Sequence, residues 1–193
     1  MTNEVSDHSR LLNHELVPPV GIYSFDQAHT FVCFRAQHLI VGHVRGCFEA
    51  VSGTVTIADD LAASVVSVNV ETASIATRNP IRDDDLRSER YLDAAKYPTM
   101  TFRSTGVSIA PAGVWIVTGD LTLRGVCRSL ELQASFGGAV TDPYGNLRLS
   151  FSAKGHLTRR DFGLTFELLK EAGHLLVDRD IALELDVEVI RPL

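Results

Sequence analysis

Apolar side chains recur at every second position in several stretches of this chain. Successive side chains of a β-strand point to opposite faces of the sheet, so each stretch forms one continuous apolar face. The three clearest stretches are Val32, Phe34, Ala36 and His38, then Val66, Val68 and Val70, and finally Ile181, Leu183, Leu185, Val187 and Val189. Several such strands, joined by short turns with few helices between them, predict a β-sandwich or a closed β-barrel.

Glycines interrupt the long alternating runs at Gly46, Gly53, Gly119 and Gly155. Within strands, glycine marks bulges, sharp bends or places where another segment approaches closely. A sheet must bend to close on itself, so these glycines favour a curved, closed barrel over a flat sandwich. Strands are expected at about 22–26, 30–38, 43–57, 64–74, 99–108, 114–123, 128–138, 147–159 and 177–190.

Residues 79–97 break the alternation and are predicted to form a helix. Asn79 is a suitable N-cap, Pro80 suits the first helical position, and Pro98 ends the run. In an antiparallel barrel, a single inserted helix is either a lid over one end or a connector on the surface. The sequence leaves both alternatives open.

The charge balance narrows the range of partners. A net charge of −6 argues against nucleic acid and against anionic membrane surfaces, because both attract basic patches. The chain has no run of about 18 apolar residues, so the sequence predicts no transmembrane helix. Residues 1–20 lack the basic start and apolar centre of a secretory signal, so we expect a cytoplasmic protein.

The N-terminal segment and the cysteines lead to two further expectations, one about domains and one about the redox state of the thiols. Residues 1–20 are predicted to form a flexible tail, or a short helix on the barrel surface, and residues 21–193 a single barrel domain. Cys33, Cys47 and Cys127 include no CxxC pair, and in the cytoplasm they are expected to be reduced thiols.

The apolar faces of the predicted strands define the candidate ligand-contacting residues. These are Phe34, Ala36, His38, Val66, Val68, Val70, Met100, Phe102, Leu121, Leu123, Leu132, Phe151, Ala153, Ile181, Leu183 and Leu185. A barrel of about eight strands is just wide enough to be filled by side chains or to hold one small ligand. The pattern is therefore compatible with a packed core and with a container, and an interior this apolar would suit a long hydrocarbon.

Chemically reactive groups are sparse and form no established motif. No HExxH motif occurs among the histidines, and we expect no metal site, no cofactor and no catalytic residue. The alternative is a metal- or His/Asp-dependent enzyme for a hydrophobic substrate, with His38 and Asp161 as its reactive groups. Arg45, Arg82 and Arg160 are candidates for binding a phosphate head group, because guanidinium matches phosphate in a bidentate geometry.

Seven short motifs, in this order along the chain, together resemble the YceI family of lipocalin-like proteins. They are His29-Thr30 with Val32, Phe34 and His38; Val44-Arg45-Gly46 with Phe48; Ser74-Ile75 with Thr77; Arg82-Asp83 with Leu86 and Ser88; Tyr97-Pro98 with Met100, Phe102 and Ser104; the run from Gly119 to Val126; and Arg160-Asp161-Phe162-Gly163. The resemblance covers about residues 21–190.

The resemblance implies a mainly β fold, an extended eight-stranded antiparallel lipocalin-like barrel with one helical insertion. It further implies non-enzymatic binding, storage or transport of a long-chain isoprenoid in the barrel interior, such as a polyprenyl phosphate, a quinone-like compound or a similar amphiphilic lipid. That lipid is the expected partner, and exposed barrel strands would permit a homodimer.

Overall fold

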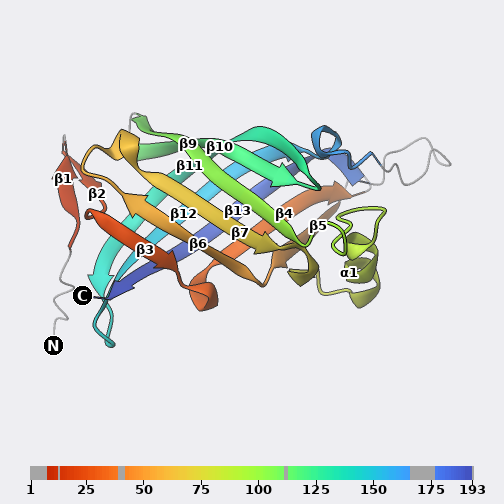
Figure 1. The fold of residues 1–193 in the computed structure, drawn as a ribbon, viewed down its shortest axis with the longest axis horizontal. Helices are drawn as coiled ribbons and strands as arrows, with labels where there is room; N and C mark the ends of the chain where they lie inside the picture. Colours follow the sequence, from red (N-terminus) through yellow and green to blue (C-terminus); the bar gives the residue numbers. More distant parts are fainter. Residues whose placement is uncertain (1–7, 13, 39–41, 111–112, 166–176, 193) are drawn as a thin grey trace.

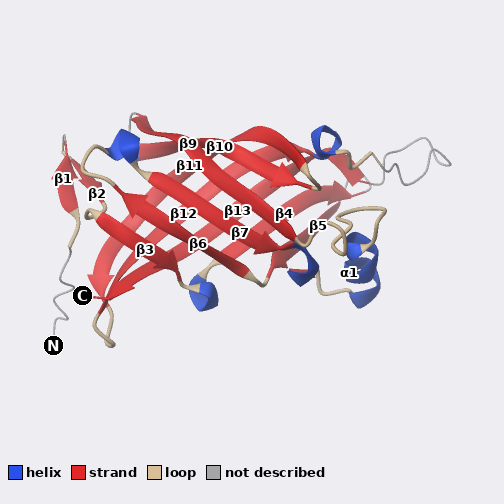
Figure 2. Cartoon of the chain, viewed as in Figure 1, coloured by secondary structure: helices blue, strands red, loops and turns tan. Residues whose placement is uncertain are grey.

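Strands dominate the computed structural model, which describes residues 8–12, 14–38, 42–110, 113–165 and 177–192 (Figures 1 and 2). The strands are β1 (Arg10–Leu12), β2 (Glu15–Val17), β3 (Gly21–Phe25), β4 (Phe31–His38), β5 (Gly42–Phe48), β6 (Val51–Ile57), β7 (Val65–Glu71), β8 (Ile75–Ala76), β9 (Thr99–Ala110), β10 (Val114–Leu123), β11 (Val126–Thr141), β12 (Asn146–Thr158) and β13 (Val177–Pro192). The helices are α1 (Pro80–Arg87) and the short 3-10 turns η1 (Gln27–His29), η2 (Leu61–Ala63), η3 (Thr72–Ser74) and η5 (Arg159–Phe162).

The main sheet closes into a barrel in which every neighbouring pair of strands is antiparallel. The order around it is β12-β11-β10-β9-β7-β6-β3-β13, and the pairing of β12 with β13 completes the circle. Strands β4, β5 and β8 extend the sheet at one end of the barrel. There β4 pairs with β13, β5 pairs with β4, and β8 pairs with β5. The prediction of an eight-stranded antiparallel barrel is therefore confirmed.

The interior glycines mark close approaches between neighbouring groups. Gly119 lies at a register shift between β9 and β10, and a Cβ there would come within 2.5 Å of the Phe102 ring. A Cβ on Gly46 would lie 2.6 Å from the ring of Phe34. Aromatic rings that face into the barrel thus find room only because their strand partners have no side chain.

Helix α1 lies against one end of the barrel, where its chain connects β8 to β9 (Figure 2). Asn79 caps it, as predicted, by accepting a hydrogen bond from the backbone N–H of Arg82. The predicted extension to residue 97 is wrong, because the helix ends at Arg87 and turns follow. The Ser88 hydroxyl donates to the Asp85 carbonyl 2.6 Å away, which satisfies a helix-end acceptor and stops the helix there.

The opposite end of the barrel is covered by the hairpin of β1 and β2, in which Leu11 pairs with Leu16 (Figure 1). Val17 is only 1% exposed, and the Tyr23 hydroxyl donates to the Pro19 carbonyl. The described part of the predicted tail is therefore a packed β-hairpin, and neither a free tail nor a helical turn. Burial of Val17 is the physical reason, since a free tail would leave it in water.

Cys33 and Cys47 form a disulfide bond across β4 and β5, and Cys127 is free and exposed. The prediction that all three are reduced is wrong for this pair. The antiparallel register places the two residues directly opposite each other, with 4.0 Å between their Cα atoms. Disulfides persist mainly in oxidising compartments, so the pair does not fit the reducing compartment on which the expectation of free thiols was based. No helix among the described residues is long and apolar enough to cross a bilayer.

Candidate functional site

The barrel encloses a cavity of about 440 Å³, lined mainly by apolar side chains from its strands. Phe34, Val68, Leu132 and Leu183 face inward, pack against the core and still remain only partly buried. Inward-facing side chains keep such accessibility only where the interior is not filled. The barrel is therefore a container along this part of its length.

Side chains pack solidly at the end of the barrel covered by β1 and β2. Tyr23, Leu149 and Val189 are fully buried there, Val17 and Leu147 nearly so, and none of them borders the cavity. We call this the closed end. The cavity extends from the closed end to the α1 end, where Leu86 and Leu92 from the helical segment form part of its wall. The helical segment thus contributes to the cavity wall and is more than a surface connector.

Polar side chains border the cavity mostly at the α1 end, and hydrogen bonds to the protein hold the guanidinium of Arg82 there. Its Nε donates to the Thr77 hydroxyl at 2.7 Å and its Nη2 donates to the Thr77 carbonyl at 2.8 Å. Asp83 in turn accepts hydrogen bonds from the backbone N–H and the hydroxyl of Thr77. Thr77 and Asp83 are both buried, so this chain of hydrogen bonds fixes the guanidinium of Arg82 at the cavity wall.

A second polar group at the α1 end consists of Asp85, Tyr91 and Arg159. Arg159 is 7% exposed and donates to the Leu164 carbonyl at 2.7 Å. Burial raises the pKa of Tyr91 above its usual value, and the Asp85 carboxylate raises it further, against the opposing charges of Arg90 and Arg159. The tyrosine hydroxyl therefore stays protonated at neutral pH, and positive and negative charges at this end offset each other.

All fifteen of the predicted apolar residues that the structure describes in full border the cavity. His38, the sixteenth candidate, belongs to β4, but its side chain lies outside the described residues. Its pairing with Asp161 is therefore not tested, and Asp161 is an exposed residue of the η5 turn.

Of the three arginines proposed for a head group, only Arg82 borders the cavity. Arg45 is exposed on β5, and Arg160 lies outside the cavity lining. The strand pleat turns Arg45 outward, and the η5 turn places Arg159 at the cavity wall beside Arg160. A head-group contact by Arg45 or Arg160 at the mouth of the barrel stays a prediction. Arg159 has the same parity as Leu157 in the predicted strand 147–159, and this signal could have identified it.

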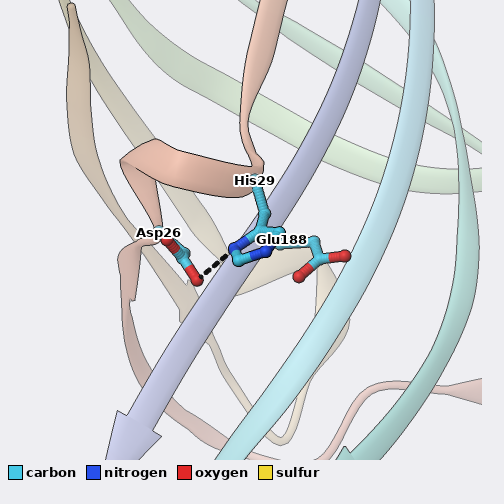
Figure 3. A group of neighbouring side chains, drawn as sticks. All are labelled: Asp26, His29 and Glu188. Atoms are coloured by element: carbon cyan, nitrogen blue, oxygen red, sulfur yellow. Dashed lines mark hydrogen bonds and ion pairs between the residues drawn. The ribbon is translucent and has the colours of Figure 1, made fainter.

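Outside the barrel, Asp26, His29 and Glu188 form a group whose ligand atoms lie within 4.8 Å of one another (Figure 3). His29 Nδ1 is 2.9 Å from Asp26 Oδ2, but Arg148 Nη1 lies 2.5 Å from that same oxygen and 2.5 Å from Glu188 Oε2. The hydrogen bond from Arg148 also lowers the pKa of Asp26. A metal ion would have to displace this guanidinium, so the group is best explained as an ion-pair network that joins η1 to β12 and β13.

A closed antiparallel barrel of eight strands around an apolar cavity is an architecture with room for one small hydrophobic ligand. The model of the YceI-like domain matches residues 23–189, and this chain belongs to the YceI family. It is 40% identical to Protein YceI of Escherichia coli O157:H7 over 141 residues, which are 72% of this chain and 73% of that protein.

Two solved structures show the same fold. The YCEI protein of Campylobacter jejuni superimposes with a TM-score of 0.68 and 29% identity, covering 81% of this chain and 90% of that one. A polyisoprenoid binding domain from Saccharophagus degradans, implicated in plant cell wall breakdown, gives a TM-score of 0.67 over 88% of this chain and 98% of that one. The latter is 16% identical, so its likeness shows the fold alone.

Proposed function

We propose that this protein binds a long-chain isoprenoid lipid inside its barrel and carries or stores it without chemical change. The observation that carries the proposal is the apolar cavity of about 440 Å³ inside the barrel wall. Two findings support it: membership of the YceI family, and the barrel that this chain shares with a polyisoprenoid binding domain.

The energetics of burial favour a ligand held mainly by its hydrocarbon tail. Burying one CH₂ group is worth about 0.8 kcal/mol, so one five-carbon isoprene unit is worth roughly 3–4 kcal/mol before losses. Ordering the tail and losing its free motion reduce this gain. A hydrogen bond to a charged head group adds only about 1.5–3 kcal/mol, so several isoprene units outweigh one head-group contact.

The apolar candidates named from the sequence are the residues that we expect to touch the tail. Phe34, Leu132 and Leu183 are the best placed of these, because they border the cavity and remain partly accessible from it. A ligand that covered them would remove apolar surface from water without displacing any packed side chain. Tail length and cavity volume should therefore govern selectivity more than head-group chemistry.

The first test is to look for lipid in the protein as it is made. Protein purified from cells is extracted with organic solvent, the extract is analysed by mass spectrometry, and lipid-free protein is then offered radiolabelled prenyl lipids. We expect a co-purified isoprenoid and stoichiometric uptake. Repeated recovery of empty protein that takes up no prenyl lipid would refute the proposal.

The second test uses a pair of neighbouring substitutions on β11. Leu132→Asp places a carboxylate in the cavity wall, whereas Gln133→Asp places the same group on the exposed outer face. Burying a charge in an apolar site is strongly unfavourable, so Leu132→Asp should abolish lipid uptake while Gln133→Asp leaves it intact. Phe102→Asp should also abolish uptake. Normal uptake by folded Leu132→Asp protein would show that the cavity is not the lipid site.

A further inference from the structure

Arg35 and Arg45 lie directly opposite each other on the outer face of β4 and β5, at the α1 end of the barrel (Figure 1). Arg35 is half-buried, Arg45 is exposed, and neither borders the cavity. Like charges in directly opposed cross-strand positions destabilise a sheet, because their side chains are neighbours. The fold therefore holds two positive charges together in a position where charges of opposite sign would be more stable.

No side-chain contact neutralises this pair within the part of the chain that the structure describes. Neither guanidinium has a hydrogen bond or an ion pair there. On its other side, Arg35 faces Ala182 of β13, which brings no charge. Two residues to either side of Ala182, Glu184 faces Lys154 of β12, and Asp180 accepts a hydrogen bond from a β12 hydroxyl. The two guanidiniums are therefore available to an anion from outside the protein.

The disulfide between Cys33 and Cys47 fixes the two arginines in register. It joins β4 to β5 on the same outer face, two residues before Arg35 and two residues after Arg45. A covalent link so close to the pair prevents the strands from sliding or separating to relieve the repulsion. The guanidiniums are thus neighbours before any ligand arrives, which lowers the entropic cost of holding one ligand with both.

We propose that Arg35 and Arg45 form a binding site for a phosphate group on the outer face of the barrel. A guanidinium matches phosphate with two parallel N–H···O bonds, and one phosphate has the charge and the oxygens to satisfy both arginines. His43, exposed on the same face of β5, adds a further donor. The phosphate belongs to a soluble phosphate ester or to a phospholipid head group at a membrane surface. The site lies outside the cavity, so this inference does not rest on the proposed lipid-binding function.

The first test measures the binding of phenyl phosphate, a soluble phosphate ester, to the full chain by isothermal titration calorimetry. Arg35→Gln and Arg45→Gln should each weaken binding about three- to tenfold, because each removes one bidentate ion pair. Arg128→Gln is the matched control, since it removes the same charge from an exposed position on β11, and it should leave the affinity unchanged. The net charge of the chain is −6, so the attraction is local and should weaken as salt is added.

Arg45→Glu gives a variant that should fold and yet lack the site. Its carboxylate would lie opposite Arg35, so a cross-strand ion pair should replace the repulsion and raise the urea midpoint in sodium chloride. Replacing chloride by phosphate at equal ionic strength should raise the midpoint more for the wild type than for Arg45→Glu, because a ligand that binds only the folded state stabilises it. The variant also corrects for the general stabilising effect of phosphate on folded proteins.

Vesicles distinguish the two sources of the phosphate group. The protein is sedimented with vesicles of phosphatidylcholine, with and without phosphatidic acid. Binding that requires phosphatidic acid and is lost in Arg45→Glu assigns the site to a lipid head group, whereas loss of phenyl phosphate binding alone in that variant assigns it to a soluble ester. If neither phenyl phosphate nor the vesicles distinguish the wild type from Arg45→Glu, the proposal is overturned.

Discussion

Replacing Gly46 with alanine should push a phenylalanine ring into the cavity. An added Cβ would lie 2.6 Å from Phe34 Cζ and 2.7 Å from Thr77 Cγ2, both far inside normal contact distance. Thr77 cannot yield easily, because Asp83 holds its hydroxyl and its backbone N–H. Phe34 borders the cavity, so its ring is the group that has space to move.

The expected cost follows from this geometry. Overpacking by one methyl group typically costs about 1–3 kcal/mol. Movement of Phe34 also disturbs its contact with Phe48, whose ring centroid lies 6.1 Å away, and such aromatic pairs are worth about 0.5–1.5 kcal/mol beyond their burial. We therefore expect Gly46→Ala to lower the free energy of unfolding by about 1–3 kcal/mol and to reduce lipid uptake, because the ring takes up cavity volume.

The assay is urea unfolding followed by circular dichroism, with and without bound prenyl lipid, and with the free energy obtained by linear extrapolation. Gly137→Ala is the matched control, because Gly137 lies on the outer face and an added Cβ would meet nothing closer than 3.3 Å. That control should change stability by no more than about 0.5 kcal/mol. The reasoning is refuted if Gly46→Ala matches the wild type in both stability and lipid uptake.

Two further predictions concern the disulfide and the hydrogen-bonded carboxylate of Asp142. Reducing the bond between Cys33 and Cys47 opens a loop with a sequence separation of 14 and should cost about 2–4 kcal/mol in urea unfolding, whereas Cys127→Ser should be neutral; an unchanged midpoint in reductant would contradict this. The backbone N–H of Asn146 lowers the pKa of Asp142 to about 2, so its contribution to stability is present above pH 4 and is lost as the pH falls toward 2. Asp142→Asn should flatten this acid-side loss, and an unchanged pH profile would argue against the assignment.

The sequence predicts those features of the site that depend on the local backbone conformation, and it predicts less well those that depend on a particular side-chain contact. The pleat of a strand is local, so parity alone placed Phe102, Leu132 and Leu183 on the cavity wall correctly. Parity also indicates Arg159, which has the same inward parity as Leu157. The end of α1 was missed because Ser88 stops the helix by a side-chain bond that a general helix pattern does not show.

Contacts between distant residues account for the remaining differences. Cys33 and Cys47 pair because the β4–β5 register sets them opposite each other, and a one-residue shift would separate them. The ion pairs of Arg148 with Asp26 and Glu188 join three separate parts of the chain. Neither arrangement follows from local pattern, since both depend on how the whole sheet closes.

The sequence by itself determined the alternation of inward and outward side chains, because a period of two is a property of the extended backbone and needs no tertiary contact. Only the tertiary structure decided that the inward faces leave a cavity that reaches the α1 end while they pack solidly around Tyr23 and Leu149 at the closed end. The physical reason is that filling depends on the distances across the barrel, and strand register, bulges and the covering hairpin set those distances.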